Sequence, residues 1–150
     1  MSEKKARPAV FLDRDGVINV DPVEFVTRPE ELQLIPSSAE AIARFNAAGV
    51  PVIVCSNQSG VARGLYTMQT LEQISERLQQ MLGEYGARID AFYYCPHDDA
   101  DNCDCRKPRP GLLLRAAQAH GIALERSVFV GDSWRDIVAG RAARVKTVLV

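Results

Sequence analysis

Two aspartates separated by one residue, Asp13 and Asp15, follow the apolar run 10–12. Three further polar groups also come after apolar runs, and they are Ser56–Gly60, Arg106–Lys107 and Gly131–Asp136. Clustered carboxylates repel one another, and hard oxygen ligands of this kind suit Mg²⁺, which usually joins protein carboxylates to a phosphate. The four groups therefore indicate magnesium-assisted chemistry on a phosphate ester, if the fold brings them together.

The residue types in these groups fit the separate tasks of phosphoryl transfer. A carboxylate such as Asp13 can attack phosphorus and form an aspartyl-phosphate, and a second carboxylate can protonate the leaving oxygen and then activate water. Lys107, Ser56 and backbone N–H groups can hold phosphate oxygens. Taken alone, each of these groups occurs more often in a turn, at the end of a strand or in a solvated loop than in a catalytic site. Their joint occurrence, in order after successive apolar runs, favours the catalytic interpretation.

A second cluster of metal-ligand residue types lies just before Arg106. It has the spacing C-x-H-x5-C-x-C and consists of Cys95, His97, Cys103 and Cys105. Three thiolates and one imidazole complete a tetrahedral set with no open position, so we expect structural zinc, the alternative being unpaired cysteines in a polar loop. Because the loop ends at Arg106–Lys107, bound zinc would also hold these two cations in position. The remaining cysteine, Cys55, is expected to be buried in a strand.

Short apolar runs alternate along the chain with longer segments of helical spacing. The runs expected to be strands are 10–12, 50–55, 91–94, 128–130 and 147–150. Their continuous apolar character is typical of strands that are buried on both faces of a parallel sheet. The segments expected to be helices are 37–48, 70–85, 110–120 and 132–142, which begin at capping residues or proline and mostly stop at glycine.

This alternation predicts an α/β fold with an open, mostly parallel sheet. Right-handed crossovers place the carboxyl end of every strand at one edge, where ligands of such sheets bind. Asp13, Ser56, Lys107 and Asp132 would then converge at that edge. The segments after the first two strands are too short for a separate cap domain. We therefore expect an open site that admits bulky phosphorylated sugars or alcohols.

The composition is that of one globular domain spanning residues 1–150. With 47% hydrophobic and 25% charged residues, a chain of this length can bury a core without disulfides. A net charge of −1 provides no overall field for nucleic acid or an anionic membrane, and no apolar run approaches the roughly 20 residues of a membrane helix. Segment 1–8 lacks the apolar stretch of a signal peptide. We expect it to be a solvated tail on a cytoplasmic monomer with reduced cysteines.

The four polar groups together resemble the four motifs of the haloacid-dehalogenase-superfamily phosphatases. The matching stretches are Asp13–Asn19 (DRDGVIN), Ser56–Gly60 (SNQSG), Arg106–Pro108 (RKP) and Gly131–Ser133 with Asp136. The SNQSG stretch and the cysteine loop are most similar to the histidinol-phosphatase-like branch, and the resemblance covers residues 10–150. It implies a three-layer, Rossmann-like α/β fold with a zinc-binding loop and no large cap domain.

The resemblance also implies roles for individual residues. Asp13 would be the nucleophile and Asp15 the general acid and base, while Ser56 and Lys107 would stabilise the transferred phosphoryl group. The two aspartates need different protonation states near neutral pH, because Asp13 must stay ionised while Asp15 carries a proton for the leaving group.

Metal ligands and substrate contacts follow from the same resemblance. The magnesium ligands would be the Asp13 carboxylate, the Asp15 main-chain carbonyl and the Asp132 carboxylate, with Asp136 as support. The substrate contacts would be Asp21, Asn57, Gln58, Ser59 and Arg106. Of these, Arg106 would meet a second, distal phosphate.

Three functions are open at this point. The first is hydrolysis of heptose 1,7-bisphosphate at its 7-phosphate, which Arg106 favours because a bisphosphate has a second anion to bind. The second is hydrolysis of histidinol phosphate or another small phosphate ester. The third is an inactive, zinc-stabilised binding module, which the intact Asp13, Asp15 and Lys107 disfavour. Relatives continue beyond the position of Val150, so a truncated or minimal form with an exposed last strand is expected.

Overall fold

The computed structural model describes residues 5–150, so the first four residues of the expected N-terminal tail lie outside the described part. The strands are β1 (Val10–Leu12), β2 (Val52–Asn57), β3 (Ala91–Cys95), β4 (Val128–Gly131) and β5 (Lys146–Leu149). They form one sheet in the order β3-β2-β1-β4-β5, and every neighbouring pair is parallel. All five expected strands are present, and their ends differ from the predicted ones by two residues at most.

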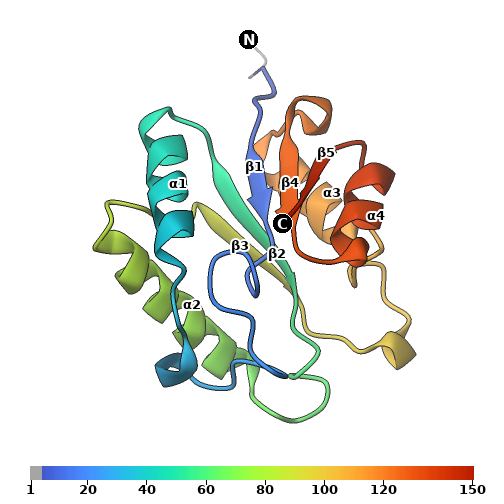
Figure 1. Ribbon diagram of the computed structural model, residues 1–150. Helices are drawn as coiled ribbons and strands as arrows, with labels where there is room; N and C mark the ends of the chain where they lie inside the picture. The colour runs from blue at the N-terminus through green and yellow to red at the C-terminus, as the bar shows by residue number, and fades with distance from the viewer. Residues whose placement is uncertain (1–4) are drawn as a thin grey trace.

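Four helices cover the two faces of this sheet (Figure 1). They are α1 (Pro36–Ala47), α2 (Met68–Gly83), α3 (Gly111–His120) and α4 (Trp134–Ala142). Helices α1 and α2 lie on one side of the sheet, and α3 and α4 lie on the other. The predicted three-layer α/β fold is confirmed. None of the helices within residues 5–150 combines the length and the apolar character needed to cross a membrane.

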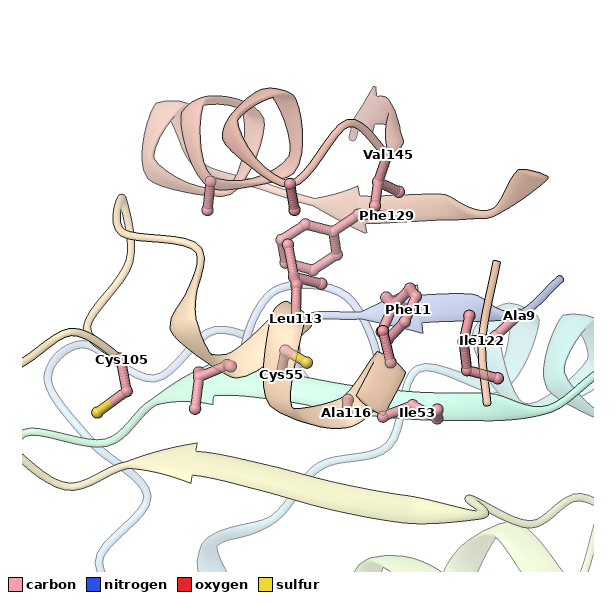
Figure 2. Packing of buried hydrophobic residues seen from close by; sticks show 14 of the residues in the cluster. Ala9, Phe11, Ile53, Cys55, Cys105, Leu113, Ala116, Ile122, Phe129 and Val145 are labelled. Carbon is pink, nitrogen blue, oxygen red and sulfur yellow. The ribbon is translucent and has the colours of Figure 1, made fainter. Parts of the chain in front are cut away.

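The alternation of side chains along β1 explains why both faces of the sheet are buried. Val10 and Leu12 pack into the cluster beneath α1 and α2, whereas Phe11 points to the opposite face. On that opposite face, Phe11 and Phe129 meet Leu113 of α3, as Figure 2 shows. Cys55 lies in the same core, fully buried as predicted, and burial raises the pKa of its thiol to about 12.

Within residues 5–150, the longest connections leave the sheet at the carboxyl ends of the first three strands. The connections after β1 and β2 contain just one short 3-10 helix, Pro29–Glu31, in the described part, which agrees with the expected absence of a large cap. The end of β3 and the connection after it hold the cysteine cluster, and the connection also contains the 3-10 helix Asp99–Asp101. At the far edge, β5 is mostly exposed, as expected.

Candidate active site

A pocket of about 270 Å³ opens at the carboxyl ends of β1, β2 and β4. Eight of the residues expected at the site line it: Asp13, Asp15, Asp21, Ser56, Asn57, Lys107, Asp132 and Asp136. Four more residues line it that the sequence did not single out for this role: Glu24, Phe25, Ser133 and Arg135. The sheet therefore brings the four polar groups together at one edge.

Lys107 lies at the base of this pocket with its side chain only 3% exposed. Its ammonium group is 3.2 Å from Asp13 Oδ2 and 2.5 Å from Asp136 Oδ1, and it also donates to the carbonyl oxygen of Cys55 at 3.1 Å. Burial by itself would lower the pKa of Lys107, but the two carboxylates outweigh it and raise the pKa. The lysine is therefore held as a cation.

The main chain of Lys107 is fixed by the end of β2. The Asn57 side chain donates to the Lys107 carbonyl at 3.0 Å and accepts from the Lys107 N–H at 2.9 Å. This pair of hydrogen bonds uses both ends of the amide. Asn57 thus positions the lysine as well as lining the pocket.

Asp13 and Asp132 face one another across the pocket. Burial raises the pKa of Asp13 to about 6, against the lowering effect of Lys107, and Asp136 adds to the rise. The pKa of Asp132 is raised by burial and then by the charges of Asp13 and Asp21. The absence of a side chain at Gly16 leaves room for the Asp132 carboxylate, because a Cβ at that position would collide with it. The result is a local excess of negative charge.

The donor set at this point fits a hard divalent cation. One carboxylate oxygen each from Asp13, Asp132 and Asp136 lies within 4.8 Å of the others. Asp136 is already engaged by Lys107 and by the N–H groups of Asp132 and Ser133, at 3.2 and 3.3 Å. Asp13 and Asp132 are therefore the carboxylates best placed to ligate an ion, which would also balance the negative charge that gathers at the pocket.

Asp15 is held by a network that the sequence reading did not anticipate. Its Oδ1 accepts from Arg14 Nε and Nη2 at 3.1 and 2.9 Å and from Asn19 Nδ2 at 3.0 Å. Its Oδ2 accepts from Gln58 Nε2 at 3.3 Å. Arg14, Asn19 and Gln58 all lie in the motifs named from the sequence, but nothing there indicated that these side chains are buried around Asp15. These four hydrogen bonds fix the orientation of the Asp15 carboxylate at the edge of the pocket.

Gln58 lies behind the site with its side chain inside the protein. It is fully buried, donates to Ser56 Oγ at 3.0 Å, and accepts from the Tyr66 hydroxyl at 2.6 Å. Ser59 is also buried and does not line the pocket within the described residues. Gln58 therefore links Ser56, which is expected to hold the phosphate, to Asp15, which is expected to transfer the proton.

Arg106 is turned toward the cysteine loop. Its Nε lies 2.7 Å from Asp99 Oδ1, and its Nη1 donates to the carbonyl oxygen of His97 at 3.3 Å. Its side chain is 13% exposed and does not line the pocket. In this arrangement, Arg106 ties the 3-10 helix of the loop to the segment that precedes Lys107.

The four cysteine-loop residues converge as expected. His97 Nδ1 is 3.4 Å from Cys105 Sγ and 3.6 Å from Cys95 Sγ, and Cys95 and Cys103 are 3.6 Å apart through their sulfurs. Ligands on a tetrahedral zinc ion with bonds of about 2.0–2.3 Å are separated by roughly this much. Backbone N–H groups of Arg106 and Cys105 outweigh burial and lower the pKa of Cys103 to about 6. The set fits a closed metal site.

Comparison with known proteins agrees with this geometry. The haloacid dehalogenase-like hydrolase family matches residues 2–144, and the chain belongs to this family. Relatives that share 40–46% of their residues with this chain are phosphatases, and this chain is a phosphatase as well.

The relatives include the D-glycero-beta-D-manno-heptose-1,7-bisphosphate 7-phosphatases of Pseudomonas aeruginosa and Helicobacter pylori. The first is 46% identical over 97% of this chain and 82% of its own length, and the second is 42% identical over 95% and 82%. A similar solved structure is the D,D-heptose 1,7-bisphosphate phosphatase of Bordetella bronchiseptica, complexed with magnesium and phosphate. It has a TM-score of 0.91 and 40% identity, over 95% of this chain and 79% of that one.

Proposed function

We propose that this phosphatase removes the 7-phosphate of D-glycero-β-D-manno-heptose 1,7-bisphosphate through an aspartyl-phosphate on Asp13. The observation that carries the chemistry is the meeting of Asp13, Asp132 and buried Lys107 in one pocket. The substrate is supported by the activity in the names of relatives that are 42–46% identical over at least 94% of this chain.

Two half-reactions follow from the roles of Asp13 and Asp15. In the first, an Asp13 oxygen attacks phosphorus, the bond from phosphorus to the sugar oxygen breaks, and Asp15 gives that oxygen a proton. In the second, Asp15 takes a proton from water, the water oxygen attacks phosphorus, and the bond to Asp13 breaks with release of inorganic phosphate. The hydrogen bonds from Arg14, Asn19 and Gln58 would keep the Asp15 carboxyl group in place through both steps.

Positive charge and hydrogen-bond donors at the base of the pocket would stabilise the transferred group. Lys107 and Ser56 would hold its equatorial oxygens, and Asp136 would keep Lys107 in place. When bound to Asp13, Asp132 and the Asp15 main-chain carbonyl, Mg²⁺ would supply further positive charge to the phosphate.

The cysteine loop would hold a structural zinc ion through Cys95, His97, Cys103 and Cys105. Among the expected substrate contacts, Asp21 and Asn57 line the pocket, and we propose that they meet the sugar. Ser59, Gln58 and Arg106 would contribute from behind the pocket wall, since none of the three side chains lines it. The single-domain organisation over 1–150, the monomeric state and the cytoplasmic location stay predictions.

The test is phosphate release from heptose 1,7-bisphosphate and from histidinol phosphate, side by side with Mg²⁺. Asp13→Asn is the blank for both substrates. We expect a clear preference in kcat/KM for the bisphosphate. Preference for histidinol phosphate would instead support the second function named above. No turnover of either substrate by zinc-loaded, folded protein would favour an inactive binding module.

A further inference from the structure

One arginine of the pocket wall has no task in the reaction as described. Arg135 is the second residue of α4 and lines the same pocket as Asp13 and Lys107. Its guanidinium lies 5.0 Å from the centre of the Trp134 ring, and it forms no ion pair within residues 5–150. Arg135 is therefore an exposed cation without an ion-pair partner among the described residues.

The charges lining the pocket make this arginine unusual. Six carboxylates line it, from Asp13, Asp15, Asp21, Glu24, Asp132 and Asp136, and two cations, Lys107 and Arg135. Lys107 is buried at the base between Asp13 and Asp136. Away from the base, a second anionic group on the substrate would meet Asp21 and Glu24, which repel it. Within the described chain, Arg135 is the lining residue that can offset this repulsion.

Arg106, the arginine expected to bind a second phosphate, is occupied elsewhere. Its Nε contacts Asp99, its Nη1 contacts the His97 carbonyl, and its side chain is mostly buried against the cysteine loop. Turning it into the pocket would break both contacts. Arg135 needs no such rearrangement, because its guanidinium is already exposed at the pocket.

We propose that Arg135 is the specificity-determining residue that binds the distal phosphate of the substrate, the one that is not transferred. The inference rests on the proposed bisphosphate substrate and assigns its second anion to a residue. A planar guanidinium presents paired N–H donors that match phosphate oxygens, and a charge-assisted pair of this kind is stronger than a neutral hydrogen bond.

The position of Arg135 in the fold suits this task. Ser133 caps α4 by accepting from the Arg135 N–H at 3.2 Å, so the backbone that carries the side chain is fixed. The amino-terminal turn of a helix also attracts anions. Trp134 packs beside the guanidinium and limits its orientations. Arg135 is thus a partly ordered cation on a rigid element.

The experiment compares a bisphosphate with a monophosphate of the same sugar. Arg135→Gln should lower kcat/KM for heptose 1,7-bisphosphate by about 10-fold, mainly through KM, and leave heptose 7-phosphate within about 2-fold. Arg135→Lys should cause a smaller loss than Arg135→Gln, since lysine keeps the positive charge but lacks the paired N–H donors of the guanidinium. Arg106→Gln serves as the matched control and should change the ratio between the two substrates less than Arg135→Gln does.

Binding of the product provides a readout that is independent of turnover. Heptose 1-phosphate keeps the distal phosphate, so its Kd should rise about 10-fold in Arg135→Gln when followed by Trp134 fluorescence. Equal losses for bisphosphate and monophosphate, or an unchanged product Kd, would overturn the assignment to Arg135. If the unmodified protein hydrolyses another phosphate ester but not the bisphosphate, the proposed substrate fails first, and this inference fails with it.

Discussion

The carboxylate pocket and the cysteine loop are two metal-ligand clusters at the same edge of one sheet, and they are built in opposite ways. In the pocket, the ligands come directly after the central strands β1 and β4, and they face a space of about 270 Å³. In the loop, the four ligands lie within eleven consecutive residues, from Cys95 at the end of the edge strand β3 to Cys105, and face one another. The first cluster is positioned by the sheet, whereas the second positions its own loop.

This difference separates what each metal should do. The sheet holds Asp13 and Asp132 together although their charges repel, so the pocket should form without an ion and need one only for chemistry. The loop has one short 3-10 helix, and its residues in or against the core are the three cysteines of the cluster itself, so its order should depend on the ion. Lys107 joins the two regions, since it ends the loop and lies at the base of the pocket.

The largest expected effect comes from removing a loop ligand. Cys105→Ser should lose the zinc and lower the Tm by about 10 °C or more, because metal binding contributes directly to the folding of a closed site. Zinc content by elemental analysis and Tm by circular dichroism measure it. Activity should fall with the zinc, because the loop then no longer fixes Lys107.

Two substitutions outside the loop serve as controls for Cys105→Ser. Asp132→Asn in the pocket should abolish most activity without lowering the Tm, since it removes one of two repelling charges. Cys55→Ala should keep the zinc, because Cys55 is a buried strand residue apart from the cluster. Full activity and an unchanged Tm in Cys105→Ser would contradict the contrast between the two clusters.

Lys107 tests the link between the regions. Lys107→Met should lower kcat by about 10²–10³-fold, because it removes a fixed cation from the transferred phosphoryl group. It should also cost about 3–5 kcal/mol of unfolding free energy at neutral pH, since Asp136 is left buried without its partner. Steady-state kinetics and urea unfolding measure the two effects. Restoring stability but not activity with the double change Lys107→Met and Asp136→Asn would separate them.

The sequence was most informative where local pattern and topology decide the outcome. Unbroken apolar runs gave the parallel strands, and the order of motifs after them gave Asp13, Ser56, Lys107 and Asp132 at one edge. Ligand spacing was enough for the cysteine cluster, because its four members lie within one loop.

The direction in which a side chain points could not be predicted from local pattern and strand order. Arg106 and Arg135 are both arginines close to a motif, but one turns to Asp99 and the other lines the pocket. Arg14 packs against Tyr94, which is distant along the chain, and Gln58 bonds to Tyr66 within an irregular connection that has no periodic pattern. Such contacts become visible only once the strands are assembled.

Gln58 provides a smaller test, in which a supporting role is separated from substrate contact. Gln58→Leu should lower kcat about 5-fold and leave KM within about 2-fold, because the lost hydrogen bonds orient Asp15 and Ser56 rather than the substrate. It should also lower the unfolding free energy by about 1–3 kcal/mol, since the Tyr66 hydroxyl loses its acceptor. A rise in KM with unchanged kcat would instead assign Gln58 to the substrate.

The smallest expected effect is at an ion pair on the loop surface. Arg63 Nε lies 3.0 Å from Asp98 Oδ2 and joins the connection after β2 to the cysteine loop, but both side chains are substantially exposed. Asp98→Asn keeps an oxygen that can accept from the Asp99 N–H and removes the charge, so the Tm should change by no more than about 2 °C. Zinc content and kcat should stay at the unmodified values. A large loss of zinc here would mean that surface charge, and not the four ligands, holds the loop in place.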